Sequence, residues 1–255
     1  MTSEMRIGLG QFNVLTDEKL AYIKQLGAED FLMNTPDLPG NKRWELHDLV
    51  DLKRRADNAE LRLMALENVP ISFYDKAMLG LPGRDTQIEH MKYTIRNMGK
   101  AGIPILGYHW MPNAVWRTPS PAVLRGGATA TRFDFEEHRD AELTHGKVFT
   151  AEEMWENYEY YMSRILPIAE ENNVKLALHP DDPPVPILGG VARIFGNFEG
   201  FNRAMDLFDS PYHGLDFCMG CWSEMGGHDY VVNAIKHFGS LDKIIYVHFR
   251  DVQGN

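Results

Sequence analysis

The chain has 255 residues, of which 44% are hydrophobic and 24% are charged, and its net charge is -10. This length accommodates a large core, such as a single α/β barrel of about 250 residues. The acidic balance, without a basic cluster, argues against nucleic acid as a partner because phosphate backbones would be repelled. An anionic small substrate stays compatible with it, since a bound metal or local positive groups outweigh the global field.

The N-terminus and the cysteines narrow the setting. Met1 to Gly10 lacks a basic segment followed by an apolar run, and no window approaches 18 consecutive apolar residues, which disfavours a signal peptide and a membrane span. Cys218 and Cys221 form the single C-x-x-C pair, a spacing typical of redox or zinc sites. One pair cannot build a four-cysteine zinc site or a disulfide framework. We therefore expect a reducing, cytoplasmic environment.

Short apolar runs alternate with longer helical patterns along the chain. One helix is predicted to begin after Thr16, which serves as its N-cap. Another is predicted to begin with a capping box of Thr150 and Glu153 and to be kinked at Pro167. The predicted strands are 5–10, 30–33, 61–67, 103–108, 174–179, 214–218 and 244–249. The predicted helices are 17–26, 44–59, 86–100, 150–171, 197–208 and 229–238.

This alternation predicts parallel strands, in a barrel or a doubly wound sheet. The first strand is not followed by G-x-G-x-x-G, so the dinucleotide fingerprint is missing. Residues with chemical potential stand at the carboxyl ends of five strands, where barrel enzymes place their sites: Glu67, His109, His179, Cys218 and His248. We expect a (βα)8 TIM barrel that apparently lacks its C-terminal βα unit or units, with an open sheet as the alternative.

Residues 1–255 are expected to form one barrel domain with a long insertion at about 110–149. The insertion is rich in proline and glycine, and we predict no strand within it. Such an excursion at the catalytic end of a barrel serves as a lid or substrate-binding element. A surface loop or a contact in a homo-oligomer explains it equally well.

Three of the strand-end residues predict a metal site. His179, Cys218 and His248 each stand near the carboxyl end of a successive strand. Adjacent strands lie about 4.8 Å apart, so these side chains can converge on one cation. Imidazole and thiolate suit zinc, iron(II), cobalt or manganese better than magnesium or calcium. Each residue alone is more typical of a hydrogen-bonded core histidine or a buried cysteine.

Other residues are candidates for contact with substrate. Glu67 and His109 could bind a hydroxyl or move a proton, although structural hydrogen bonding at a strand end is nearly as good an explanation. Arg250 could bind a carboxylate with two parallel hydrogen bonds. Asp181 and Asp251 could contact substrate, orient a ligand histidine or balance Arg250.

From about Leu61 onward, the chain resembles the mannonate dehydratases. The resemblance implies a xylose-isomerase-like barrel, a manganese-type cation, and His179, Cys218 and His248 as three metal ligands. The family's aspartate ligand and catalytic tyrosine would lie beyond Asn255. The segments that carry the resemblance are His179-Pro-Asp-Asp-Pro-Pro184, Gly214-Leu-Asp-Phe-Cys-Met-Gly220, Val247-His-Phe-Arg-Asp251, Glu67-Asn-Val-Pro70, Leu79-Gly-Leu-Pro-Gly-Arg-Asp85, Arg125-Gly-Gly127 and Phe133-Asp134.

The resemblance implies dehydration of D-mannonate to 2-keto-3-deoxy-D-gluconate in hexuronate catabolism. Two segments depart from the family's pattern. Ile71-Ser-Phe-Tyr74 stands where the family commonly has a histidine and acidic residues, and His109-Trp-Met-Pro112 stands where the family more usually has Asn-Phe-Met-Pro. As a hypothesis, His109 transfers a proton and Arg250 binds the substrate carboxylate. The alternatives are a metal-dependent sugar isomerase or epimerase on the same barrel and a non-catalytic sugar-acid-binding paralogue.

Overall fold

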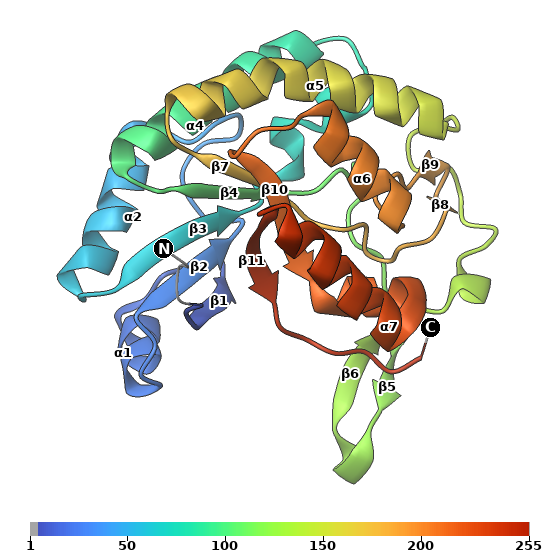
Figure 1. Cartoon of the computed structure of the whole chain (residues 1–255), viewed down its shortest axis with the longest axis horizontal. Coiled ribbons are helices and arrows are strands. Elements are labelled where there is room, and N and C mark those ends of the chain that lie inside the picture. Colours follow the sequence, from blue (N-terminus) through green and yellow to red (C-terminus); the bar gives the residue numbers. More distant parts are fainter. Residues whose placement is uncertain (1–4, 255) are drawn as a thin grey trace.

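The computed structural model describes residues 5–254 and contains a sheet of seven parallel strands that curls into most of a barrel (Figure 1). The strands occur in chain order across the sheet, and each neighbouring pair is parallel. They are β1 (Gly8–Phe12), β2 (Asp30–Asn34), β3 (Arg62–Glu67), β4 (Ile105–Tyr108), β7 (Lys175–Leu178), β10 (His213–Cys218) and β11 (Ile244–His248). All seven predicted strands are confirmed within a few residues.

The helices lie on the outer side of this curled sheet (Figure 1). Within the described part of the chain, none of them is both long enough and apolar enough to cross a bilayer. They are α1 (Asp17–Gln25), α2 (Leu46–Asn58), α3 (Asp75–Met78), α4 (Arg84–Ala101), α5 (Ala151–Glu171), α6 (Phe198–Leu207) and α7 (Met219–Ser240).

Side-chain caps fix where several helices begin. Thr16 accepts a hydrogen bond from the backbone N–H of Lys19 at the start of α1. Thr150 and Glu153 exchange hydrogen bonds with each other's backbone N–H groups at the start of α5, which is the predicted capping box. These bonds satisfy N–H groups that lack partners inside the helix.

Helix α7 begins ten residues earlier than the helix predicted at 229–238. Its first half was missed because Gly220, Gly226 and Gly227 lower helix propensity, and the backbone at the last two is non-helical. Packing outweighs this cost: the Trp222 ring is fully buried and stacks on Phe217 at a centroid distance of 5.1 Å. The helix therefore starts directly after Cys218.

The prediction that 110–149 contains no strand is wrong. β5 (Thr118–Val123) and β6 (Thr129–Arg132) pair as an antiparallel hairpin that projects from the barrel (Figure 1). Pro119 and Pro121 obscured β5, because proline is depleted in strands but tolerated in an exposed edge strand. A second small ribbon, β8 (Ile187–Leu188) with β9 (Val191–Ala192), was also not predicted.

Two apolar clusters hold the barrel together. The larger one fills the space between the sheet and the helices. The smaller one joins Ala65, Ile105 and Ala177, on β3, β4 and β7, with partly buried side chains that include Tyr246 of β11. Side chains alternate between the two faces of a strand, so residues two positions further on point the same way. The small cluster thus continues toward the carboxyl ends of the strands as the site described next.

Candidate metal centre

The strand ends bring the three predicted ligands together. His179 follows β7, and its backbone N–H donates to the Tyr108 carbonyl at 2.8 Å, which extends the ladder by one residue. Cys218 ends β10 and pairs in register with His248, the last residue of β11. The donor atoms of the three side chains lie within 4.8 Å of one another. One ion with bonds of roughly 2.0–2.3 Å to nitrogen and sulfur spans such a group.

Glu67 belongs to the same cluster. It is buried at the end of β3, and its Oε2 lies 3.0 Å from His248 Nε2. Gln11 donates to both carboxylate oxygens at 3.2 Å, and Asn34 donates to Oε1 at 3.1 Å. Gln11 belongs to β1 and Asn34 to β2, whereas Glu67 ends β3 and His248 ends β11. Residues of four strands therefore position the Glu67 carboxylate.

Asp216 is the site residue that sequence reasoning missed. It is fully buried on β10, two positions before Cys218, and forms a second group of close donor atoms with Glu67, His179 and His248. Tyr246 donates to its Oδ2 at 2.8 Å, whereas Oδ1 has no hydrogen-bond partner among residues 5–254 and lies 3.4 Å from His248 Nδ1. The signal was present: an aspartate inside an apolar strand, on the same face as a predicted ligand.

Gly107 leaves the space that the contact between Tyr246 and Asp216 needs. A Cβ at Gly107 would lie 2.3 Å from the Tyr246 hydroxyl and 3.1 Å from the Glu67 Cα. Tyr246 therefore reaches across the barrel interior from β11 toward β4. Only glycine at this position allows the tyrosine to hold Asp216.

The electrostatics of the cluster favour a bound cation. Burial lowers the pKa values of His179 and His248, but Asp216 and the Cys218 sulfur outweigh burial and raise both pKa values above the ordinary range. The pKa of Cys218 is lowered by its interactions with Cys221, His179 and His248. Buried negative charge thus holds protons on two imidazoles that otherwise could bind metal. A divalent cation can replace those protons, which is the usual exchange when metal binds.

Arg250 covers the sulfur side of the site. Its Nε donates to Cys218 Sγ at 3.1 Å and its Nη2 to Cys221 Sγ at 3.2 Å. A Cβ at Gly220 would lie 2.4 Å from Arg250 Nε, so the guanidinium rests directly on the first turn of α7. The Arg250 side chain is 37% exposed, which leaves part of it open to solvent at the mouth of the barrel.

Asp182, Cys221 and Glu224 form a neighbouring group whose donor atoms also lie within 4.8 Å of one another. Arg117, next to β5, donates two hydrogen bonds of 2.6 and 2.7 Å to the Asp182 carboxylate. The Arg250 guanidinium lies 3.5 Å from the carboxylates of both Asp182 and Glu224. Burial raises the pKa of Glu224 to about 7. Two guanidinium groups already neutralise this cluster, so it is a poor cation site beside the first one.

The other predicted residues surround the cluster without joining it. His109 is buried, and its Nδ1 accepts a hydrogen bond from the Met111 N–H at 3.1 Å. Burial, together with the nearby charge of His179, lowers the pKa of His109 to about 3. Asp181 Oδ2 accepts from the Phe195 N–H at 2.7 Å. Asp251 is exposed and accepts from the Val252 N–H at 2.9 Å.

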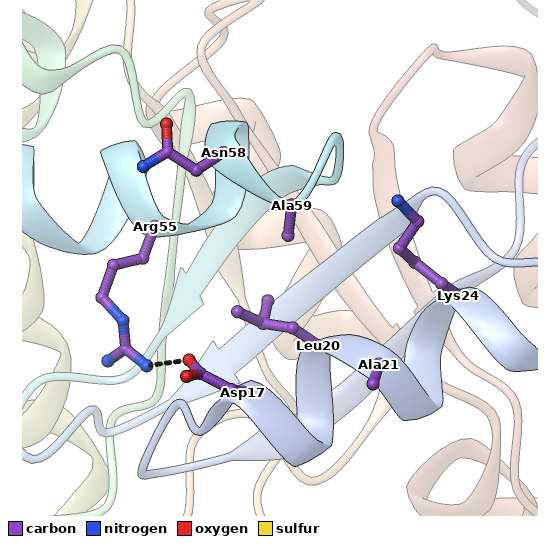
Figure 2. A pocket seen from close by; sticks show the side chains of 7 residues that line it. All are labelled: Asp17, Leu20, Ala21, Lys24, Arg55, Asn58 and Ala59. Carbon is purple, nitrogen blue, oxygen red and sulfur yellow. Dashed lines mark hydrogen bonds and ion pairs between the residues drawn. The ribbon is translucent and has the colours of Figure 1, made fainter.

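A separate groove of about 340 Å³ lies on the outside, between α1 and α2 (Figure 2). Arg55 and Asp17 form an ion pair of 3.2 Å across it, and Lys24 and Asn58 also line it. These side chains come from helices rather than from strand ends. The groove therefore does not belong to the metal cluster.

The sequence and the fold are both similar to those of mannonate dehydratases. The model of the D-mannonate dehydratase (UxuA) family matches residues 5–148 and 139–255. The mannonate dehydratase of Thermotoga petrophila is 32% identical over 267 residues, which cover 92% of this chain and 73% of that protein. The crystal structure of mannonate dehydratase from Streptococcus suis has a TM-score of 0.87 at 29% identity, covering 99% of this chain and 73% of that one.

More distant structures share the fold alone. A xylose isomerase domain protein from Planctomyces limnophilus has a TM-score of 0.53 at 11% identity and covers 95% of this chain and 73% of that one. The fold is accordingly a xylose-isomerase-like TIM barrel, as expected, of which residues 5–254 supply seven strands. With the family model matching along nearly its whole length, this chain belongs to the D-mannonate dehydratase family.

Proposed function

We propose that this chain is a metal-dependent hydro-lyase that converts D-mannonate to 2-keto-3-deoxy-D-gluconate and water. The observation that carries the proposal is the convergence of His179, Cys218 and His248 from three strand ends in a member of the mannonate dehydratase family. A sugar acid fits the site because Arg250 offers a guanidinium beside the sulfur ligand.

Manganese is the proposed metal, held by His179, Cys218 and His248. The same donors also suit Fe²⁺, Co²⁺ or Zn²⁺. When bound, the cation would polarise substrate oxygens and stabilise the negative charge that develops beside the carboxylate. Asp216 supports this site through the 3.4 Å contact between its Oδ1 and His248 Nδ1, since carboxylates commonly orient ligand histidines.

Arg250 is proposed to bind the substrate carboxylate. In the structure its contacts are two sulfurs and two carboxylate oxygens at 3.5 Å, all weaker than a bidentate pair with a carboxylate. A partly exposed guanidinium with such contacts can turn toward an incoming anion. Asp251, exposed one residue further on, lies at the same rim as a proposed substrate contact.

His109 is proposed to assist departure of the C3 hydroxyl. Its Nδ1 accepts a backbone N–H, so a neutral ring keeps its proton on Nε2. Because burial holds the pKa of His109 near 3, the ring is neutral at pH 7 and acts there as a hydrogen-bond donor. Glu67 is proposed to accept a hydrogen bond from a substrate hydroxyl, held in place by Gln11 and Asn34.

Asp181 is proposed to act on substrate indirectly. It is fully buried, with one oxygen on the Phe195 N–H and the other 3.8 Å from Arg193 Nη1. These contacts fix the loop that follows His179. We further propose one barrel domain over 1–255 with an insertion at about 110–149, a cytoplasmic role in hexuronate catabolism, and a homo-oligomer to which the insertion contributes.

Product analysis tests the proposal. The manganese-loaded chain is incubated with D-mannonate and, in parallel, with aldoses and ketoses, and the products are identified by mass spectrometry and NMR. We expect a 2-keto-3-deoxy acid from D-mannonate, formed with loss of one water. An isomer or epimer of unchanged mass would indicate the isomerase or epimerase alternative, and tight binding without turnover would indicate a binding protein.

Two variants test the assigned roles. His109→Ala should lower kcat about 100-fold or more, the usual scale for removing a hydrogen-bond donor that stabilises charge developing in the transition state. Arg250→Ala should raise KM for D-mannonate, and Arg54→Ala, an exposed arginine on α2, serves as the control. Full turnover in His109→Ala, or an unchanged KM in Arg250→Ala, would remove the respective role.

A further inference from the structure

The second cysteine has no part in the proposed reaction, yet it lies beside a metal ligand. Cys218 is the N-cap of α7, and Cys221 is the third residue of that helix. Both side chains are buried, and neither forms a disulfide within residues 5–254. Side chains three positions apart on a helix share one face. The two sulfurs therefore stand next to each other at the start of α7.

The hydrogen bonds of Arg250 show how the sulfurs of Cys218 and Cys221 are oriented. Nε and Nη2 of one planar guanidinium donate to Cys218 Sγ at 3.1 Å and to Cys221 Sγ at 3.2 Å. Both sulfurs thus face the same partly exposed side chain, which lies at the mouth of the barrel.

The position of the two cysteines at the start of α7 is compatible with a disulfide. A disulfide requires Cα atoms about 4.4–6.8 Å apart and Cβ atoms about 3.5–4.5 Å apart. Residues i and i+3 of a helix have Cβ atoms about 5–6 Å apart, and Cys218, as N-cap, has a non-helical φ of -76° and ψ of 99°. Because Cys218 lies outside the regular helix, a rotation of its backbone at the end of β10 can bring its Cβ closer to that of Cys221.

We infer that Cys218 and Cys221 form a reversible disulfide when the protein meets hydrogen peroxide, and that this bond removes the sulfur ligand of the metal centre. The disulfide itself depends only on the two sulfurs. Its effect on the metal rests on the proposed metal site. Failure of one part is therefore distinguishable from failure of the other.

The chemistry balances with peroxide as oxidant. The Cys218 thiolate attacks one peroxide oxygen, the O–O bond breaks, one water leaves after proton uptake, and a sulfenic acid remains on Cys218. The Cys221 sulfur then attacks Cys218 Sγ, the S–O bond breaks, and a second water leaves as the S–S bond forms. Two thiols lose two electrons and two protons in total, and one peroxide becomes two waters.

Peptide mapping tests the bond without reference to activity. The metal-free full chain is treated with hydrogen peroxide, alkylated with N-ethylmaleimide and digested with trypsin, which leaves both cysteines in one peptide spanning 204–236. We expect that peptide two hydrogen masses lighter and unalkylated, and alkylated twice after dithiothreitol. Peroxide-treated peptide that still carries two alkyl groups, or Cys218 oxidised to sulfinic acid with Cys221 free, would overturn the inference.

Manganese binding tests the consequence, and Cys221→Ser is the matched control. Oxidised wild type should bind Mn²⁺ more than about tenfold more weakly than reduced wild type, because loss of a ligand costs at least as much as loss of its supporting contact. Cys221→Ser should bind Mn²⁺ like reduced wild type and form no disulfide. If wild type forms the disulfide and keeps its affinity for Mn²⁺, the metal site is wrong and the disulfide stands.

Discussion

Removing the charge of Asp216 should separate metal affinity from stability. Asp216→Asn keeps the shape of a side chain that is fully buried and whose Oδ1 lacks a hydrogen-bond partner in the described part of the protein. The substitution removes the negative charge that raises the pKa values of His179 and His248 and that faces His248 Nδ1 at 3.4 Å. The site then attracts a divalent cation less strongly.

The expected loss is about 10- to 100-fold in affinity for Mn²⁺, the usual effect of removing a carboxylate that supports a ligand histidine. This corresponds to about 1.4–2.7 kcal/mol. Stability without metal should change little or rise, because burying a carboxylate costs free energy. Burial indeed raises the pKa of Asp216.

Titration with chelator-buffered Mn²⁺ measures the affinity, and urea unfolding in excess chelator measures the stability. Asp209→Asn is the control, since Asp209 is an exposed aspartate paired with Lys243. Equal affinities of Asp216→Asn and wild type for Mn²⁺ would refute the reasoning. A large loss of metal-free stability would instead make Asp216 a structural residue.

Three further predictions concern stability and the sulfur side of the site. His213 is buried beside the Tyr108 hydroxyl, and burial lowers the pKa of His213 to about 4. The neutral His213 ring therefore contributes its full stabilisation above the unfolded-state pKa of 6.5. This stabilisation is lost as the pH falls toward 4. Between pH 7 and pH 5, the free energy of unfolding measured in urea should therefore fall by about 2 kcal/mol less in His213→Gln than in wild type. The same pH dependence in both proteins would contradict this. Thr150→Ala should lower the free energy of unfolding by about 1 kcal/mol through loss of the capping box, with Thr150→Ser close to wild type. Gly220→Ala should displace Arg250 and raise KM for D-mannonate while Mn²⁺ affinity is retained; an unchanged KM would show that the guanidinium is not constrained there.

The sequence predicts the barrel well because its strands are short apolar runs between turn residues. β10 is buried at every position and reads as such in Gly214-Leu-Asp-Phe-Cys218. The convergence of His179, Cys218 and His248 was predictable for the same reason, since each residue stands where such a run ends. What the pattern does not carry is pairing across the barrel: the Tyr246 contact with Asp216 and the Gln11 contact with Glu67 join distant segments.

The missed elements have their causes in tertiary packing. The β5–β6 hairpin forms despite Pro119 and Pro121, and a two-stranded ribbon alone is marginally stable in water. Arg117 anchors its base to Asp182, a residue 65 positions away. The first half of α7 likewise depends on the burial of Trp222 rather than on helix propensity. Local sequence does not encode such contacts.

The position of the bound ion shows whether His179, Cys218 and His248 hold the metal. A crystal of the manganese-loaded chain, measured on both sides of the manganese absorption edge, gives an anomalous difference map in which the ion appears as a peak. We predict one strong peak bonded to the Cys218 sulfur and to one imidazole nitrogen each of His179 and His248. A peak that avoids the sulfur, for example between Glu67 and Asp216, or no peak among these side chains, would contradict it.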